Sequence, residues 1–148
     1  TCKDHDMSGY DFAIIQLGVN DAIYNEGWTN ESKTAFENII NKLKAENNNI
    51  KIFVSTIIPA TSYTGEHINS VSDGIRQLVQ TLNNENIVLL DMAKYGHTAE
   101  EEAYNNGHLS AYGYYRLAQD YKNYIGWIIA NKKPDFRNVQ FIGTDYEY

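Results

Sequence analysis

The sequence predicts an α/β fold with a parallel sheet between layers of helices. Three short apolar runs are nearly continuous rather than alternating, as is typical of strands buried on both faces of a parallel sheet. Segments with helical periodicity separate these runs, and such alternation indicates crossover connections between parallel strands. The chain has 148 residues, which is the length of one domain.

The strands are expected at Tyr10–Leu17, Ile50–Ile58 and Ile87–Met92, where Ile, Val, Leu and Phe predominate. A tail segment, Val139–Gly143, is a candidate for a further edge strand. Three strands are few for a sheet of this kind, because sheets average about five or six. The sequence therefore predicts either an exposed strand edge or strands supplied from elsewhere.

The helices are expected at Thr29–Glu46, His67–Asn83 and Ala111–Asn131, because apolar residues recur there at three- and four-residue spacing. Thr29 or Asn30 is the expected N-cap of the first helix, and Ser110 that of the last. In the last helix the expected apolar stripe comprises Tyr114, Leu117, Ala118, Tyr121, Ile125, Ile128 and Ile129.

Composition excludes several classes of function. The net charge of −7 argues against a general binder of nucleic acid, which carries clustered Lys and Arg. No apolar stretch reaches the roughly 20 residues of a membrane-spanning helix. The single Cys2 cannot form an internal disulfide. His97, Glu100, Glu101, Glu102 and His108 share one loop, but their spacing matches no zinc motif, so we expect no metal and no cofactor.

Candidate site residues follow the strands, because ligands of open parallel sheets bind at the carboxyl ends of the strands. The first run ends in Gly18-Val19-Asn20-Asp21. Gly18 permits a sharp turn or a close approach. The Asn20 amide can donate a hydrogen bond to a developing oxyanion. Asp21 can anchor the loop, although these residues are equally typical of a simple strand-ending turn.

His108 precedes the last helix and is a candidate general base, with a surface histidine as the alternative. A base needs a nucleophile, yet no serine of the chain lies in a Gly-x-Ser-x-Gly elbow. Tyr24 and Trp28 lie just past Asn20, where they are placed either to contact a sugar or acyl group or to fold over the neighbouring helix.

Together these segments resemble the SGNH hydrolases, also called the GDSL esterase/lipase family. Residues 10–21, YDFAIIQLGVND, resemble the family's block III, residues 55–61, STIIPAT, its next strand, and residues 107–115, GHLSAYGYY, its block V. The resemblance implies a flavodoxin-like, three-layer α/β/α fold and ester hydrolysis through an acyl-serine intermediate. It also implies that Asn20 donates to the oxyanion and that His108 is the base.

Blocks I and II of the family, with the nucleophilic serine, have no counterpart in the chain. The resemblance therefore implies that residues 1–148 are the C-terminal part of a single domain whose first strands lie upstream of Thr1. We accordingly expect the isolated chain to be inactive. We also expect a partner segment to cover the sheet edge at Tyr10–Leu17.

One departure concerns the acid partner of His108. The family has Asp three residues before the histidine, whereas this chain has Asn105. An asparagine can hydrogen-bond an imidazole but cannot stabilise imidazolium by charge. Asp91, a glutamate among residues 100–102, or a backbone carbonyl in a His–Ser dyad remain alternatives.

The leading hypothesis is a serine esterase for short acyl esters, such as acetyl groups on a sugar. The second is a non-catalytic module that binds carbohydrate or a partner through Tyr24, Trp28 and the loop before His108. The third is an unrelated flavodoxin-like ligand-binding or signalling domain, which ranks low because the sequence has no phosphate-cradling glycine loop.

Overall fold

The fold is a parallel sheet with helices on both faces, seen in a computed structural model that describes residues 6–58, 65–95, 103–104 and 108–130. Within these residues three parallel strands form the sheet in the order β1-β2-β3. They are β1 (Phe12–Gln16), β2 (Lys51–Ser55) and β3 (Ile87–Leu90). All three predicted strands are present, each shorter than its apolar run. The tail segment at Val139–Gly143 lies outside the described residues, as does Cys2.

Five helices and a short hairpin accompany the sheet in the described part of the chain. The helices are α1 (Val19–Tyr24), α2 (Asn30–Glu46), α3 (Gly65–Leu82), α4 (Met92–Tyr95) and α5 (Ala111–Ala130). The hairpin pairs β4 (Ala103–Tyr104) with β5 (His108–Leu109) in antiparallel fashion. The predicted helices correspond to α2, α3 and α5, whereas the short α1 and α4 and the hairpin were not predicted.

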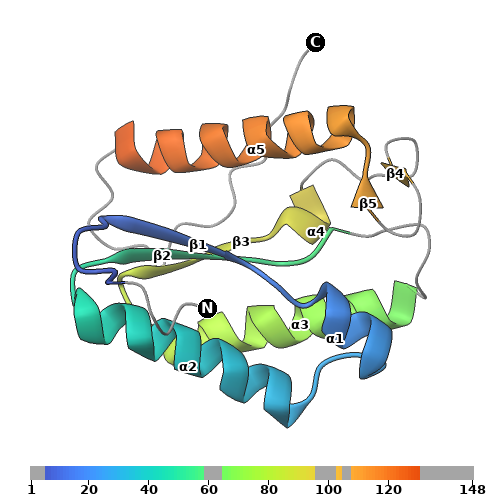
Figure 1. The fold of residues 1–148 in the computed structure, drawn as a ribbon, viewed down its shortest axis with the longest axis horizontal. Coiled ribbons are helices and arrows are strands. Elements are labelled where there is room, and N and C mark those ends of the chain that lie inside the picture. The colour runs from blue at the N-terminus through green and yellow to red at the C-terminus, as the bar shows by residue number, and fades with distance from the viewer. Residues whose placement is uncertain (1–5, 59–64, 96–102, 105–107, 131–148) are drawn as a thin grey trace.

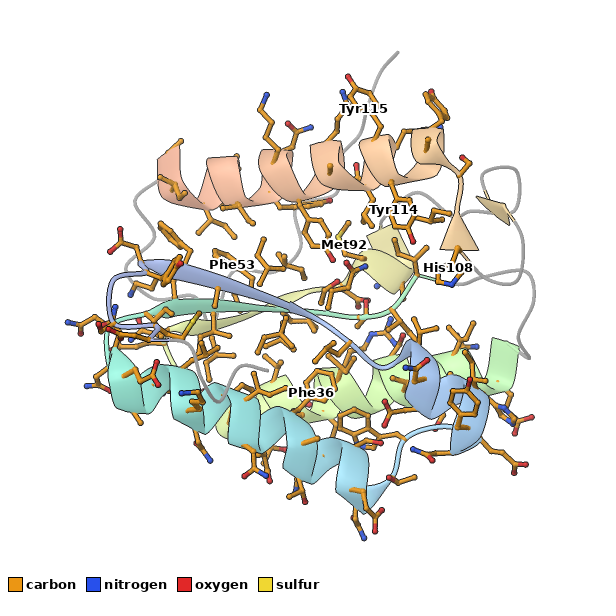
Figure 2. All side chains as sticks on the ribbon, viewed as in Figure 1. Phe36, Phe53, Met92, His108, Tyr114 and Tyr115 are labelled. Atoms are coloured by element: carbon orange, nitrogen blue, oxygen red, sulfur yellow. The ribbon has the colours of Figure 1, made fainter. Side chains whose placement is uncertain are left out.

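The layers confirm the predicted three-layer α/β/α architecture. Helices α2 and α3 lie on one face of the sheet and α5 lies on the other (Figure 1). One apolar cluster joins β1 and β2 to α2 and α3 through residues such as Ile40, Val54 and Ile75. A second cluster joins β2 and β3 to α5 through Phe53 and Leu117 (Figure 2). None of the described helices is long and apolar enough to cross a membrane.

The predicted caps also appear. The Thr29 side chain accepts a hydrogen bond from the Ser32 backbone N–H, and the Ser32 hydroxyl accepts one from the Thr29 N–H, which forms a capping box at the start of α2. Ser110 accepts a hydrogen bond from the Gly113 N–H at 3.0 Å and so caps α5.

The buried face of α5 differs from the expected stripe. The buried residues are Gly113, Leu117, Asp120, Tyr124 and Ile128. Tyr114 and Ile129, which we expected in the stripe, are about half exposed, at 50% and 48%. The expectation was correct for Leu117 and Ile128, which are buried, and for Tyr121 and Ile125, which pack against the same cluster. It was wrong for the exposed members, and it omitted the fully buried Asp120 because apolar periodicity does not register an aspartate on the inner face.

Strand β1 is one of the two edge strands of the described sheet, and two of its apolar side chains are exposed. Phe12 is 40% exposed and Ile14 49% exposed, whereas Phe53 and Val54 of the neighbouring β2 are 0% exposed. Ile14 and Phe53 are partners in the parallel register, so the contrast arises within one pair. The sheet therefore has an exposed edge strand at β1, as the sequence predicted, although β3 is the other edge of the described sheet.

Candidate active site

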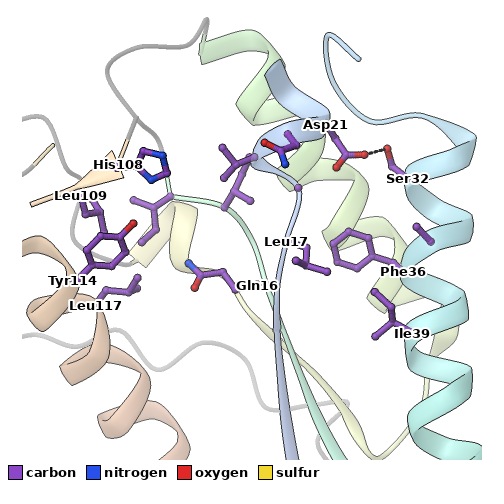
Figure 3. Close-up of a pocket in the computed structure, with 16 residues that line it drawn as sticks. Gln16, Leu17, Asp21, Ser32, Phe36, Ile39, His108, Leu109, Tyr114 and Leu117 are labelled. Atoms are coloured by element: carbon purple, nitrogen blue, oxygen red, sulfur yellow. Dashed lines mark hydrogen bonds between the residues drawn. The ribbon is translucent and has the colours of Figure 1, made fainter. Parts of the chain in front are cut away.

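The candidate site is a cavity of about 470 Å³ at the carboxyl end of β1 (Figure 3). It lies between the β1–α1 turn and α2 on one side and β5 with the start of α5 on the other. Its lining brings together Asn20 and His108, which lie far apart in the sequence. The other residues that line it are Gln16, Leu17, Gly18, Val19, Asp21, Ser32, Ala35, Phe36, Ile39, Ile57, Ile58, Leu109, Tyr114 and Leu117.

The turn that presents Asn20 depends on Gly18. Gly18 has φ +117°, a conformation that L side chains rarely adopt, and it is the N-cap residue of α1. A Cβ on Gly18 would lie 2.7 Å from Cγ1 of Val71 and 3.5 Å from Cγ2 of Ile57. The glycine thus lets the end of β1 approach α3 closely. The chain then turns directly into α1, so Asn20 sits in the first turn of a helix rather than in a simple turn.

Asp21 anchors this turn to the next helix. Its carboxylate accepts a hydrogen bond from the Ser32 hydroxyl, the same hydroxyl that completes the α2 capping box (Figure 3). Its backbone carbonyl accepts hydrogen bonds from Asn25 and Gly27 at 3.0 and 3.2 Å. Asp21 therefore fixes α1, and with it Asn20, relative to the N-terminus of α2.

His108 occupies the opposite side of the cavity. It is an exposed residue of β5, and it lies beside Leu109 and Tyr114 and across from Asp21 and Ser32 (Figure 3). The capped start of α5 follows directly, so a rigid element holds the backbone next to the imidazole. Neutral imidazole can both donate and accept a proton, which suits it to general acid–base chemistry.

Asp91, one candidate partner of His108, is engaged elsewhere. Arg76 donates from Nε to Oδ2 at 2.8 Å and from Nη2 to Oδ1 at 2.7 Å, and Thr56 donates to Oδ1 at 3.2 Å. The hydrogen bonds to Asp91 raise the pKa of the Arg76 guanidinium above its ordinary value. Asp91 does not line the cavity. It ties the end of β3 to α3 and to the residue after β2.

The other candidate partners, Asn105 and the glutamates at 100–102, lie outside the described residues, as does His97. Within the described part of the chain, no group of three His, Cys, Asp or Glu side chains is placed to hold a metal ion.

The two aromatic candidates do not line the cavity. Tyr24 is 77% exposed at the end of α1. Trp28 packs against Phe36, with ring centroids 5.3 Å apart, and its indole occupies the space that a side chain at Gly74 would fill. Phe36 itself lines the cavity, so Trp28 lies one residue behind the cavity wall.

Several lining residues escaped the sequence reasoning. Tyr114 was expected to pack on the helix face, but its position six residues after His108 places it in the first turns of α5, beside the cavity. Gln16 is the last residue of β1 and Leu17 directly follows it, and their side chains lie on different sides of the chain (Figure 3). Because both line one cavity, the cavity extends around the end of β1.

The fold and the site place the chain among α/β proteins whose ligand site lies at the carboxyl ends of parallel strands. A family model described as GDSL-like lipase/acylhydrolase matches residues 3–116. The chain belongs to this family, as the resemblance of its motifs indicated. A comparison with curated proteins found no match.

Two solved structures share the fold. One is a crystal structure of an acetyl esterase mutant with an acetate ion, with a TM-score of 0.70 and 19% sequence identity. The other is a carbohydrate esterase family 3 protein from Talaromyces cellulolyticus, with a TM-score of 0.69 and 20% identity. They match 87% and 86% of this chain, respectively, and this chain covers 66% of each of them.

Proposed function

We propose that this chain supplies the oxyanion-donor and general-base part of a serine esterase active site. The observation that carries the proposal is the shared cavity, in which Asn20 and His108 converge from the β1–α1 turn and from β5. A neutral amide donor and an imidazole are the two groups, besides the nucleophile, that acyl transfer to serine requires. Membership of the acylhydrolase family supports this reading.

The proposed reaction runs in two halves. The hydroxyl oxygen of a serine attacks the ester carbonyl carbon while His108 takes the hydroxyl proton. The Asn20 amide donates a hydrogen bond to the resulting oxyanion. The oxyanion collapses, the alcohol leaves with the proton from His108, and an acyl-serine remains. Water then attacks the acyl carbon while His108 takes its proton. The second oxyanion collapses, the serine oxygen leaves and takes that proton from His108, and the carboxylic acid is released.

We propose that the nucleophile lies on polypeptide upstream of Thr1. Ser32 is the serine among the lining residues, and it is 3% exposed and committed to Asp21 and Thr29. The open edge of β1 offers unpaired backbone groups at the rim of the same cavity. A strand that pairs with β1 would deliver its carboxyl end beside Asn20. Residues 1–148 would then be the C-terminal part of one domain.

The proposed substrates are short acyl esters, with carbohydrate O-acetyl groups as the first choice. Both fold neighbours carry esterase names, one of them for acetyl esters and the other for carbohydrate esters. The proposed partner of His108 is Asn105, a glutamate among residues 100–102 or a backbone carbonyl, because Asp91 already binds Arg76 and Thr56.

The test uses the protein with its upstream residues, assayed with p-nitrophenyl acetate and a fluorophosphonate probe. Asn20→Ala should lower kcat roughly 10²–10³-fold, and His108→Ala roughly 10⁴–10⁶-fold. Asn25→Ala and His67→Ala are matched controls away from the cavity lining and should retain activity. The 148-residue chain alone should show no turnover. Turnover by that chain, abolished in His108→Ala, would contradict the upstream nucleophile.

The second candidate is a non-catalytic module of the same fold, which Asn105 favours because it replaces the family's acid. In that case the longer protein would not label with the fluorophosphonate probe even with an upstream serine present. Labelling that requires His108 would exclude this candidate.

A further inference from the structure

A second groove lies on α3, away from the candidate active site. It has a volume of about 540 Å³, and its lining includes Trp28, Asp73, Arg76, Gln77 and Gln80. Asp73, Gly74, Gln77 and Gln80 follow one another at helical spacing, so they share one face of α3. Trp28, from the α1–α2 connection, lies against this face.

Trp28 is held rigidly in the groove wall. Its backbone N–H donates to the Ser70 hydroxyl at 3.1 Å. A Cβ on Gly74 would come within 2.2 Å of two atoms of the indole, so glycine is required for the ring to rest on the helix. Glycine inside a helix costs about 0.5–1 kcal/mol relative to alanine. Gly74 therefore makes α3 less stable at the point where the indole packs. Trp28 is half-buried, and part of its ring lines the groove.

The polar groups of the groove are neutral or already paired. Arg76 donates to Asp73 at 2.6 Å and to Asp91 through two further N–H groups. Its charge is thus balanced, and the groove offers no uncompensated cation for a phosphate or carboxylate ligand. Gln77 and Gln80 are exposed amides, each with donors and an acceptor, which match the hydroxyl groups of a sugar.

We propose that this groove binds a neutral oligosaccharide, with Trp28 against a sugar ring and Gln77 and Gln80 on its hydroxyls. An aromatic side chain beside amide groups suits the apolar C–H face and polar rim of a pyranose. The groove is separated from the candidate active site by Phe36, which contacts Trp28 and lines the other cavity. The binding site is distinct from the ester-hydrolysing site and does not depend on hydrolysis.

The experiment uses the 148-residue chain with Trp127→Phe, which leaves Trp28 as the single tryptophan. Cellohexaose, xylohexaose and maltohexaose are titrated while Trp28 emission and backbone amide shifts are recorded. We expect at least one sugar to bind with a Kd of about 1 mM and to change Trp28 emission. The double variant Gln77→Ala/Gln80→Ala should weaken binding about tenfold, the equivalent of one to two hydrogen bonds.

Gln119→Ala, an exposed glutamine on α5, is the matched control and should leave Kd unchanged. Gly74→Ala adds a methyl group where the indole lies and should abolish the emission response while circular dichroism stays native. The proposal is overturned if none of the three sugars binds. It is equally overturned if one binds with unchanged Kd in the glutamine double variant and causes no amide shifts on α3.

Discussion

Strands β1 and β2 have the same length and a mainly apolar composition but different surroundings. Both are five-residue apolar strands, and they pair in parallel along their whole length. The residues of β2 after Lys51 are buried, whereas β1 leaves Phe12, Ile14 and Gln16 exposed. The apolar pattern of β1 is that of a strand covered on both faces. Its composition therefore differs from its surroundings in the described part of the chain, where Phe12 and Ile14 are exposed.

The candidate site likewise has a covered side, next to β2 and β3, and an open side, next to β1. On the covered side, α5 packs on β2 and β3, and β5 with His108 directly precedes this helix. On the open side, the β1–α1 turn carries Asn20 at the free edge of the sheet. Both residues line the cavity, although only one side of the site is fully packed. Local turn chemistry at Gly18 and Asp21 therefore positions Asn20 without help from a further strand.

The largest expected effect on the free energy of unfolding is that of Phe53→Ala, which we compare with Phe12→Ala. The two rings stack with centroids 6.0 Å apart. In the 148-residue chain, Phe53→Ala should lower the free energy of unfolding by roughly 3–5 kcal/mol, because the ring is fully buried. Phe12→Ala should cost about 1 kcal/mol, since its ring is 40% exposed. Urea unfolding measures both.

The same Phe12→Ala substitution in the longer protein extends this comparison. If a strand covers β1 in the longer protein, Phe12→Ala should there cost about 2–3 kcal/mol more than in the 148-residue chain. An equal cost of Phe12→Ala in both proteins would show that β1 remains an exposed edge.

The next effect concerns Tyr121, on the covered side. Its hydroxyl donates to Ser55 at the end of β2 at 2.8 Å, and burial raises its pKa to about 12. Below pH 10 the tyrosine is protonated in both the folded and the unfolded states, so it contributes no pH dependence. Between pH 10 and 12 the unfolded state loses the proton first. The free energy of unfolding should therefore fall by about 2–3 kcal/mol over that range.

Tyr121→Phe removes the titrating group and keeps the ring. Its unfolding free energy should depend less steeply on pH than that of the wild type above pH 10, as urea unfolding at several pH values measures. Tyr24→Phe, on the open side and 77% exposed, is the matched control and should keep the wild-type slope. Identical slopes for wild type and Tyr121→Phe would contradict the assignment.

The predicted and unpredicted parts of the fold differ in the range of the interactions that create them. Apolar runs and caps at Thr29 and Ser110 are local, and they predicted the sheet, the three long helices and their order. The inner face of α5 depends on tertiary contacts, so the burial of Asp120 was not visible in its periodicity. Helix α1 was missed because Gly-Val-Asn-Asp is equally typical of a turn.

The candidate site was partly predictable for the same reason. The rule that ligands bind at the carboxyl ends of parallel strands predicted one shared site for Asn20 and His108, and both line the cavity. The hairpin that contains His108 was not predicted. Trp28 could not be assigned, because only the structure shows that Gly74 leaves room for the indole on α3. The engagement of Asp91 by Arg76 joins residues of two elements, and no sequence spacing indicates it.

A smaller effect compares two glycines. Gly18→Ala should lower the free energy of unfolding by about 2 kcal/mol, because its φ of +117° and its contact with Val71 both oppose a Cβ. Gly126→Ala, within α5 with no atom within 4 Å of the added Cβ, should instead raise it by about 0.5–1 kcal/mol. Thermal and urea unfolding measure the two signs, and a neutral Gly18→Ala would show that the turn relaxes without strain.

The smallest effect tests the link between Asp21 and α2. Ser32→Ala removes the hydroxyl that binds Asp21 and completes the capping box, so we expect a loss of about 1 kcal/mol in unfolding free energy. In the longer protein, kcat should fall while KM changes little, because the substitution loosens α1 and Asn20, and Ser32 itself, which lines the cavity, is only 3% exposed. Thr34→Ala removes an exposed hydroxyl from the same helix and should change neither quantity. If Ser32→Ala lost stability but kept full kcat, Asn20 would be positioned by Gly18 alone, and the open side of the site would need no anchor to α2.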